Sequence, residues 1–218
     1  MISIHRSSFS TRDSIWAVVP VKPLRRAKSR LARALKANQR AALARSMFAR
    51  TLDVLASVDR VSGIAVISND LTVQEIARAK HATPLAEAGS GLNAAVSEAC
   101  AWATAQGASG ALIVPTDLPL LTTFDLDALI DLAIEPECVI LAPDRRDDGT
   151  NVLLLKPPQA IQPAFGVASF ESHYRRARQT GRPVRVYRSL TIGLDIDRPA
   201  DLERYNELAA LDALTLYE

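Results

Sequence analysis

Strand-like and helix-like stretches alternate along this sequence between residues 15 and 211. Short runs of apolar and β-branched residues predict strands over 15–21, 64–69, 111–116, 138–143, 151–156 and 184–188. Apolar residues at helical spacing predict helices over 38–55, 71–80, 92–106, 124–134, 169–179 and 199–211. Such an alternation is typical of a mostly parallel sheet covered by helices on both faces, a three-layer α/β fold. The connection between 138–143 and 151–156 is short and polar, so one of these two strands departs from the parallel pattern.

The composition places this alternation in one domain. The chain has 218 residues, 48% of them hydrophobic and 23% charged, which is enough for a sizeable core. No internal repeat or linker divides it, so we predict a single domain over residues 15–218. Residues 1–14 have no apolar run, which predicts a flexible extension and neither a signal peptide nor an anchor. We therefore expect a cytoplasmic protein.

Charge and cysteine content limit which partners and which cysteine chemistry we expect. The net charge of +2 gives the chain no global affinity for polyanions, so we expect no nucleic-acid partner, and no membrane partner either. Cys100 lies in a predicted helix and Cys138 opens a predicted strand. They fit buried, reduced thiols better than a disulfide or a metal site.

Asp117 follows a predicted strand at the edge where open α/β sheets bind ligands. Pro115 and Pro119 flank it and restrict the backbone, which holds the carboxylate in place. A rigid carboxylate suits a hard metal ion. An Asp in this position also commonly closes a turn or caps a helix, here one that starts near Phe124. Asp117 alone does not decide between these interpretations.

A second acidic pair favours the metal. Asp195 and Asp197 are two residues apart on a segment expected to be extended, so both side chains point to the same face. Like charges side by side destabilise a fold unless a cation lies between them. Here the pattern favours a metal site over a plain acidic surface.

A basic loop leaves the first predicted strand. Residues 20–31 carry five cations: Lys22, Arg25, Arg26, Lys28 and Arg30. They repel one another unless solvent or an anion neutralises them, and a nucleotide triphosphate is such an anion. The loop matches neither the P-loop nor the dinucleotide glycine fingerprint, so side-chain cations would do the work of backbone amides. A solvated basic loop is the alternative.

The loop over residues 85–93 is a candidate for binding a base. Gly89 and Gly91 stand directly before a predicted helix, so backbone can approach a planar ligand and free N–H groups can donate to it. The Glu87 carboxylate would accept from the N1–H and amino groups of guanine, and we assign Asn93 to the same loop. A flexible connection is the alternative.

A third polar region spans residues 147–151 and 165–170. Gly166 with Ser169, at the start of a predicted helix, forms an anion-binding arrangement of a hydroxyl and N-terminal amides. Ser169 also fits a plain N-cap. Thr150 adds a hydroxyl from the neighbouring connection.

Six stretches form a set: PVKPLRRAKSRL at 20–31, GLN at 91–93, IVPTDLPLL at 113–121, DGTN at 148–151, FGVASFESH at 165–173 and LDIDRPADL at 194–202. Together they resemble the CofC/FbiD family, the guanylyltransferases of coenzyme F420 biosynthesis, over roughly residues 15–205. The resemblance implies a nucleotidyltransferase domain similar to the nucleotide-diphospho-sugar transferase fold. The implied substrates are GTP and a phosphorylated three-carbon acid.

The resemblance also implies roles for individual residues. Magnesium, as two ions, would be held by Asp117, Asp195 and Asp197. The carboxylate and phosphate of the acid would be held by Thr150, Gly166 and Ser169. The triphosphate would be contacted by Lys22, Lys28 and Arg30. A homodimer, and hand-over of the product to the next enzyme of the F420 pathway, stay open as partners.

The implied chemistry is attack by a phosphate oxygen of the acid on the α-phosphorus of GTP. A phosphomonoester has a second pKa of about 6, so the nucleophile is already dianionic and needs no general base. This agrees with the histidines His5, His81 and His173, which form no catalytic arrangement with Ser, Asp or Cys in the sequence.

The acid itself is left open among 2-phospho-L-lactate, phosphoenolpyruvate and 3-phospho-D-glycerate. Three other functions also stay open. They are a nucleotidyltransferase for a molybdopterin or sugar-phosphate acceptor, a regulatory nucleotide-binding domain, and a glycosyltransferase of similar fold.

Overall fold

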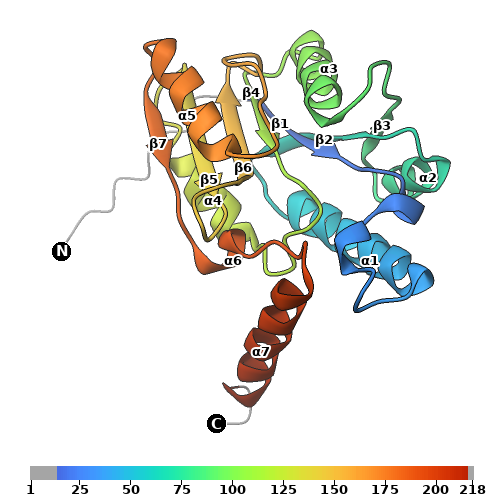
Figure 1. Ribbon diagram of the computed structural model, residues 1–218. Coiled ribbons are helices and arrows are strands. Elements are labelled where there is room, and N and C mark those ends of the chain that lie inside the picture. Colours follow the sequence, from blue (N-terminus) through green and yellow to red (C-terminus); the bar gives the residue numbers. More distant parts are fainter. Residues whose placement is uncertain (1–13, 216–218) are drawn as a thin grey trace.

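The computed structural model describes residues 14–215, with side-chain surroundings as far as residue 209. Residues 1–13 of the expected N-terminal extension lie outside the described part. A seven-stranded sheet runs through the described residues in the order β3-β2-β1-β4-β6-β5-β7 (Figure 1). In chain order its strands are β1 Ile15–Pro20, β2 Val61–Ile67, β3 Thr83–Leu85, β4 Gly110–Ile113, β5 Cys138–Pro143, β6 Thr150–Lys156 and β7 Val184–Val186.

One strand of this sheet runs against the others. β6 is antiparallel to both of its neighbours, β4 and β5. The remaining strand pairs are parallel. The prediction that one of the strands 138–143 and 151–156 departs from the parallel pattern is thus confirmed. As a consequence, the N-terminal end of β6, at Thr150, lies at the same edge of the sheet as the C-terminal ends of β1 and β4.

Helices cover both faces of the sheet, as predicted. The helices of the described residues are α1 Ala37–Ala56, α2 Leu71–Ala79, α3 Leu92–Ala105, α4 Thr123–Asp131, α5 Ser169–Gln179, α6 Leu190–Gly193 and α7 Pro199–Thr215. One core cluster packs α1, α2 and α4 on the sheet, and a second packs α3 and α5 on the opposite face. Successive residues of β6 alternate between them: Leu154 belongs to the first cluster, and Leu153 and Leu155 to the second. This period of two is what a sheet buried on both faces requires.

Short elements were missed, and four strands, β1, β2, β4 and β7, end earlier than predicted. β3, α6 and two 3-10 turns, η1 Leu24–Arg26 and η2 Ser29–Leu31, have three or four residues each, too few for a periodic signal. β4 ends at Ile113 rather than at residue 116. The next residue, Val114, still donates its N–H to the Val18 carbonyl at 3.0 Å, but Pro115 has no N–H with which to continue the ladder.

Two further expectations concern the thiols and the membrane. Cys100 and Cys138 are both buried and form no disulfide, as predicted, and burial raises the pKa of the Cys100 thiol to about 12. Between residues 14 and 215, no helix combines the length and the hydropathy needed to cross a membrane.

Candidate active site

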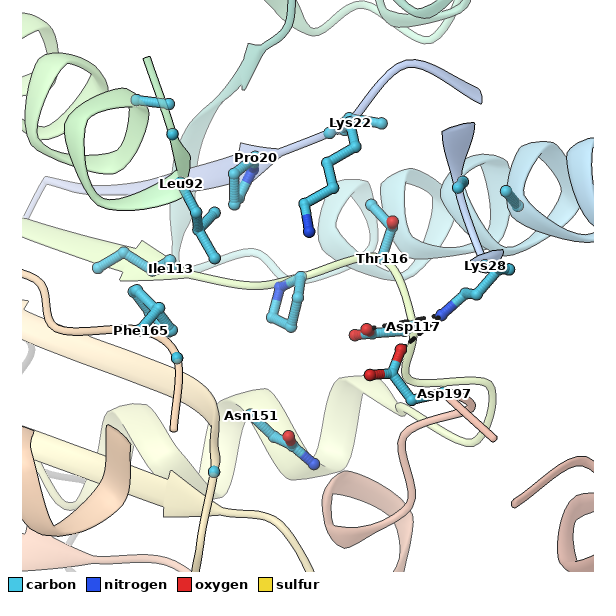
Figure 2. Close-up of a pocket in the computed structure, with 18 of the residues that line it drawn as sticks. Pro20, Lys22, Lys28, Leu92, Ile113, Thr116, Asp117, Asn151, Phe165 and Asp197 are labelled. Carbon is cyan, nitrogen blue, oxygen red and sulfur yellow. Dashed lines mark ion pairs between the residues drawn. The ribbon is translucent and has the colours of Figure 1, made fainter. Parts of the chain in front are cut away.

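A pocket of about 470 Å³ opens at the C-terminal edge of the parallel strands (Figure 2). The loops that follow β1 and β4 line it, together with the start of β6 and the segment before α5. Nine of the predicted site residues lie in its wall: Lys22, Lys28, Glu87, Gly91, Asp117, Thr150, Gly166, Ser169 and Asp197. Arg30, Asn93 and Asp195 are not part of the wall. The structure therefore brings most of the candidates, taken from six separate stretches of the sequence, to one cavity.

The two acidic stretches lie side by side because their backbones are bonded. The Ile196 N–H donates to the Asp117 carbonyl at 3.0 Å. Ile196 is fully buried in a small cluster with Leu31 and Met47, and Leu194 is also buried. This alternation leaves Asp195 and Asp197 partly exposed on either side of buried Ile196, in the extended pattern that the sequence predicts.

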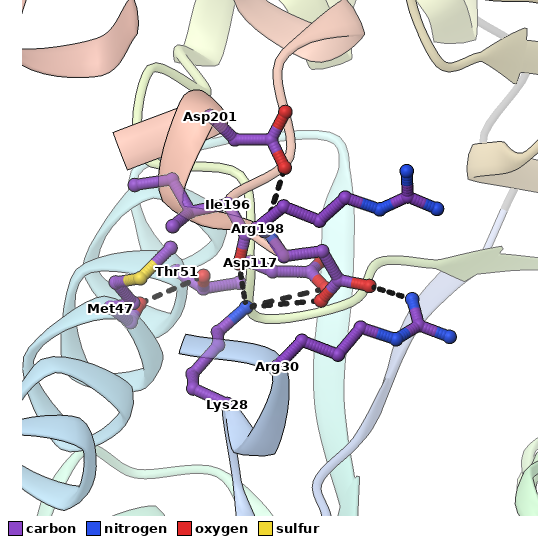
Figure 3. Close-up of polar contacts among 9 residues, drawn as sticks. Lys28, Arg30, Met47, Thr51, Asp117, Ile196, Arg198 and Asp201 are labelled. Atoms are coloured by element: carbon purple, nitrogen blue, oxygen red, sulfur yellow. Dashed lines mark hydrogen bonds and ion pairs between the residues drawn. The ribbon is translucent and has the colours of Figure 1, made fainter. Parts of the chain in front are cut away.

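Lys28 places its ammonium group among these carboxylates (Figure 3). Its Nζ lies 3.5 Å from Asp117 Oδ2 and 3.9 Å from Asp197 Oδ1, and it donates to the Ile196 carbonyl at 2.6 Å. The Lys28 side chain is only 8% exposed, and its backbone adopts the left-handed conformation at φ 55°. Three acceptors around one largely buried ammonium fix its position.

The acidic cluster fits a divalent cation by its donor chemistry. Burial, together with the negative charges of Asp117 and Asp197, raises the pKa of Asp195 to about 6. Carboxylate oxygens crowded in this way are ligands for a hard cation. Among the described residues, however, no three His, Cys, Asp or Glu side chains are grouped closely enough to hold a metal ion. The ammonium of Lys28 stands between two of the three carboxylates, so a metal site of Asp117, Asp195 and Asp197 stays a prediction.

Asp117 does not cap the helix that follows it. The N-cap of α4 is Thr122, whose hydroxyl accepts from the Asp125 N–H at 3.2 Å while the Asp125 carboxylate accepts from the Thr122 N–H. The alternative interpretation of Asp117 as a helix cap is therefore wrong. The Asp117 carboxylate is left to face the pocket and Lys28.

The basic loop divides its cations between two tasks. Arg30 donates to Asp197 at 2.8 Å at the rim, where its side chain is 66% exposed. Lys22 points into the pocket without an ion pair to any described residue (Figure 2). The loop itself is anchored because the Leu24 N–H donates to the Asp70 carboxylate at 2.9 Å and Leu24 is buried. Lys22 is therefore the pocket cation that is most available to an anion.

The expected base loop is held from both sides. Glu98 on α3 accepts from the Ala88 N–H at 2.9 Å and from the Gly89 N–H at 2.7 Å. The Asn69 side chain exchanges two hydrogen bonds with the backbone of Glu87. Burial and the charge of Glu98 raise the pKa of the Glu87 carboxyl group. The connection is thus constrained rather than freely flexible.

Asn93 has a different partner from the one expected. Its side-chain nitrogen donates to the Phe165 carbonyl at 3.0 Å, and its oxygen accepts from the Phe165 N–H at 2.7 Å. Phe165 lines the pocket directly before Gly166. Asn93 therefore connects the start of α3 to the expected acid-binding segment, and its contact with the base stays a prediction.

The expected acid-binding residues form a tight group. Ser169 Oγ accepts from the Thr150 N–H at 2.9 Å, and both residues are buried at the pocket wall. The N-cap of α5 is Ala168 at φ 51°, so the interpretation of Ser169 as a plain N-cap is wrong. Gly166 has φ 136° and open space where a Cβ would stand. The Phe170 N–H is not available to a ligand, because it donates to the Asp148 carbonyl at 3.1 Å.

Three positioning residues were missed by sequence reasoning. Asn69 ends a predicted strand at the ligand edge of the sheet, and that position was a usable signal. Glu98 and His173 lie within helices, where nothing in the sequence distinguishes a buried anchor from an ordinary helix residue. Their roles depend on contacts with residues that are 9 to 23 positions away.

Comparison with known proteins adds the family. A family model described as "Guanylyl transferase CofC like" matches residues 15–206. The chain belongs to this family. The CofC-like membership confirms the resemblance carried by the six sequence stretches.

Individual relatives agree with the family and the fold. The phosphoenolpyruvate guanylyltransferase of Sphaerobacter thermophilus is 42% identical over 187 residues, covering 86% of this chain and 90% of that protein. The 3-phospho-D-glycerate guanylyltransferase of Colwellia psychrerythraea is 33% identical over 186 residues, covering 85% of this chain and 88% of that protein. A structure from Desulfovibrio desulfuricans, assigned as a nucleotide-diphospho-sugar transferase, superposes with a TM-score of 0.68 at 17% identity. The superposition covers 87% of this chain and 85% of that one. The last comparison confirms the expected fold.

Proposed function

We propose that this CofC-like protein transfers the GMP group of GTP to the phosphate of a three-carbon phospho-acid, with release of pyrophosphate. The observation that carries the proposal is one pocket in which cations from the β1 loop, carboxylates from two distant stretches and the Thr150–Ser169 hydroxyl pair meet. A nucleotide triphosphate needs the first two features, and a small anionic acceptor needs the third. The place of this reaction in coenzyme F420 biosynthesis is implied by the family.

The transfer exchanges one P–O bond for another. A phosphate oxygen of the acid forms a bond to the α-phosphorus, the bond from that phosphorus to the oxygen bridging the β-phosphorus breaks, and its electron pair leaves with pyrophosphate. Lys22 and Lys28 would lower the repulsion between the two anions and stabilise the departing charge. The protein needs no side-chain base, because the acid is dianionic near neutral pH.

The donor set of Asp117, Asp195 and Asp197 would hold Mg²⁺, which supplies charge neutralisation on the phosphate oxygens when bound. Lys28 is then free to leave the carboxylates for the triphosphate. The expectation of two ions stays a prediction. Glu87 would accept from the guanine edge, with Asn69 and Glu98 holding its loop in position.

Phosphoenolpyruvate is our first candidate for the acid. Proteins with that substrate in their names include relatives at 42% and 41% identity over most of the chain. The second candidate is 3-phospho-D-glycerate, which is the substrate in the name of one relative at 33% identity.

Pyrophosphate release tests the proposal. The wild-type protein should release pyrophosphate with GTP, Mg²⁺ and one of phosphoenolpyruvate, 3-phospho-D-glycerate or 2-phospho-L-lactate, and none with GTP alone. Release with a sugar phosphate but with none of these acids would replace the proposed acceptor class.

A further inference from the structure

His173 lies directly behind the expected acid-binding residues. It sits on α5, is fully buried and does not line the pocket. Both ring nitrogens are engaged: Nδ1 lies 2.9 Å from the Thr150 hydroxyl oxygen, and Nε2 accepts from the Ala164 N–H at 2.8 Å. The Phe165 ring packs edge-on against the imidazole with centroids 4.8 Å apart. His173 therefore touches the residues that form the wall without reaching any molecule inside.

The Ala164 contact determines the tautomer. A backbone N–H can only donate, so Nε2 must be the unprotonated nitrogen. In a neutral imidazole the proton is then on Nδ1, and Nδ1–H donates to Thr150 Oγ1. Burial and the charge of Arg176 lower the pKa of His173 to about 4, which keeps the ring neutral near pH 7.

The direction of this bond orients the Thr150 hydroxyl. Because its oxygen accepts from His173, its own hydrogen must be directed elsewhere, and Thr150 Oγ1 has no second partner among the described residues. Thr150 forms part of the pocket wall. With the opposite tautomer, the hydroxyl would donate to the ring and present only lone pairs to an anion, which repel it.

We infer that His173 is a positioning residue that commits the Thr150 hydroxyl to donate into the pocket, toward the anionic acceptor. The inference rests on the proposed function for the identity of that anion. The Ala164 bond serves this role by fixing the tautomer.

Two substitutions separate the two bonds of His173. The amide nitrogen of Asn can take the position of Nδ1, so His173→Asn keeps the donor to Thr150 and loses the acceptor for Ala164. The longer side chain of Gln reaches the position of Nε2, so His173→Gln keeps the acceptor and loses the donor. If His173 merely filled the core, both variants would behave alike.

The kinetic test compares the two variants with wild type and with Thr150→Val. We expect His173→Gln to raise KM for the acid about tenfold, the scale of one hydrogen bond to a charged group, with KM for GTP within about twofold. His173→Asn should recover most of that loss. In the Thr150→Val background, His173→Gln should cause no further rise in KM for the acid, because the hydroxyl through which His173 acts is no longer present.

Nitrogen NMR of the wild-type imidazole provides a readout independent of turnover. We expect a protonated Nδ1 and an unprotonated Nε2. The opposite tautomer would overturn the inference, as would equal acid KM values for Asn and Gln or additive effects with Thr150→Val. A wild type inactive with GTP and every phospho-acid would instead refute the proposed function, and the inference with it.

Discussion

Lys28 Nζ lies 3.5 Å from Asp117 Oδ2, so a lysine ammonium stands at the carboxylates that the family resemblance assigns to magnesium. Asp197 is the second carboxylate near the same nitrogen, at 3.9 Å. One cation compensates part of the crowded negative charge, yet burial and the charges of Asp117 and Asp197 still raise the pKa of Asp195. The three carboxylates can therefore still bind a further cation, and Lys28 competes with that cation for Asp117 and Asp197.

Removing this competitor should tighten metal binding. For Lys28→Met we expect Mn²⁺ to bind roughly tenfold more tightly in the absence of GTP, because a partly buried charge at this distance opposes the incoming cation. Turnover should fall, because the triphosphate loses a cation. Mn²⁺ titration followed by EPR measures the affinity. Arg30→Met is the matched control: Arg30 also pairs with Asp197 but is 66% exposed, so it should change Mn²⁺ affinity less. Unchanged or weaker Mn²⁺ binding by Lys28→Met would refute the competition.

The hydroxyl of Ser169 should matter for the acid rather than for GTP. Ser169→Ala is expected to raise KM for the acid by a factor of about 10 to 100, equivalent to roughly 1.5–3 kcal/mol for a bond to a charged group. It also leaves the Thr150 N–H without its partner. Ser172→Ala, on the same helix and away from the pocket wall, is the control. A change confined to KM for GTP would place the acceptor elsewhere.

Asn93 distinguishes a base contact from a wall contact. Because its amide holds both polar atoms of the Phe165 backbone, Asn93→Ala should raise KM for the acid more than KM for GTP. Glu98→Gln, which weakens the bonds to Ala88 and Gly89, should show the reverse preference and should reduce discrimination of GTP against ATP. Steady-state kinetics with both substrates varied measures both effects. A larger effect of Asn93→Ala on GTP would restore the original assignment of Asn93 to the base.

Acid should destabilise the fold in part through His173. Its pKa is lowered from 6.5 to about 4, so the unfolded chain takes up a proton first as the pH falls. The free energy of unfolding therefore decreases as the pH falls from about 6.5 to 4, by up to about 3 kcal/mol from this residue. His173→Asn lacks the titration, so its pH dependence should be flatter over that interval. Urea unfolding at several pH values measures the difference, and parallel curves for the two proteins would contradict the assignment.

The sequence predicts the layers better than the details of the site. A continuous apolar run reveals β5 with the observed bounds, because a strand buried on both faces is apolar at every residue. Helical spacing reveals α5 with the observed bounds. The pocket follows because strand ends of a parallel sheet share one edge. Lys28 between Asp117 and Asp197, by contrast, depends on a left-handed residue in a short loop. The Asn93–Phe165 and His173–Thr150 pairs likewise join segments whose separation the spacing does not encode.

The central claim is tested most directly by finding out which substrate supplies the oxygen that bridges the two phosphorus atoms of the guanylylated acid. Wild-type protein is supplied with GTP, Mg²⁺ and phosphoenolpyruvate labelled with ¹⁸O in its phosphate, and the products are analysed by mass spectrometry. Asp117→Asn serves as the control and should form little product. Attack by the acid on the α-phosphorus predicts that all the label stays in the guanylylated acid and that pyrophosphate carries none. Label in pyrophosphate would contradict the account. So would the absence of any guanylylated acid when phosphoenolpyruvate, 3-phospho-D-glycerate and 2-phospho-L-lactate, each labelled in the same way, are all tried.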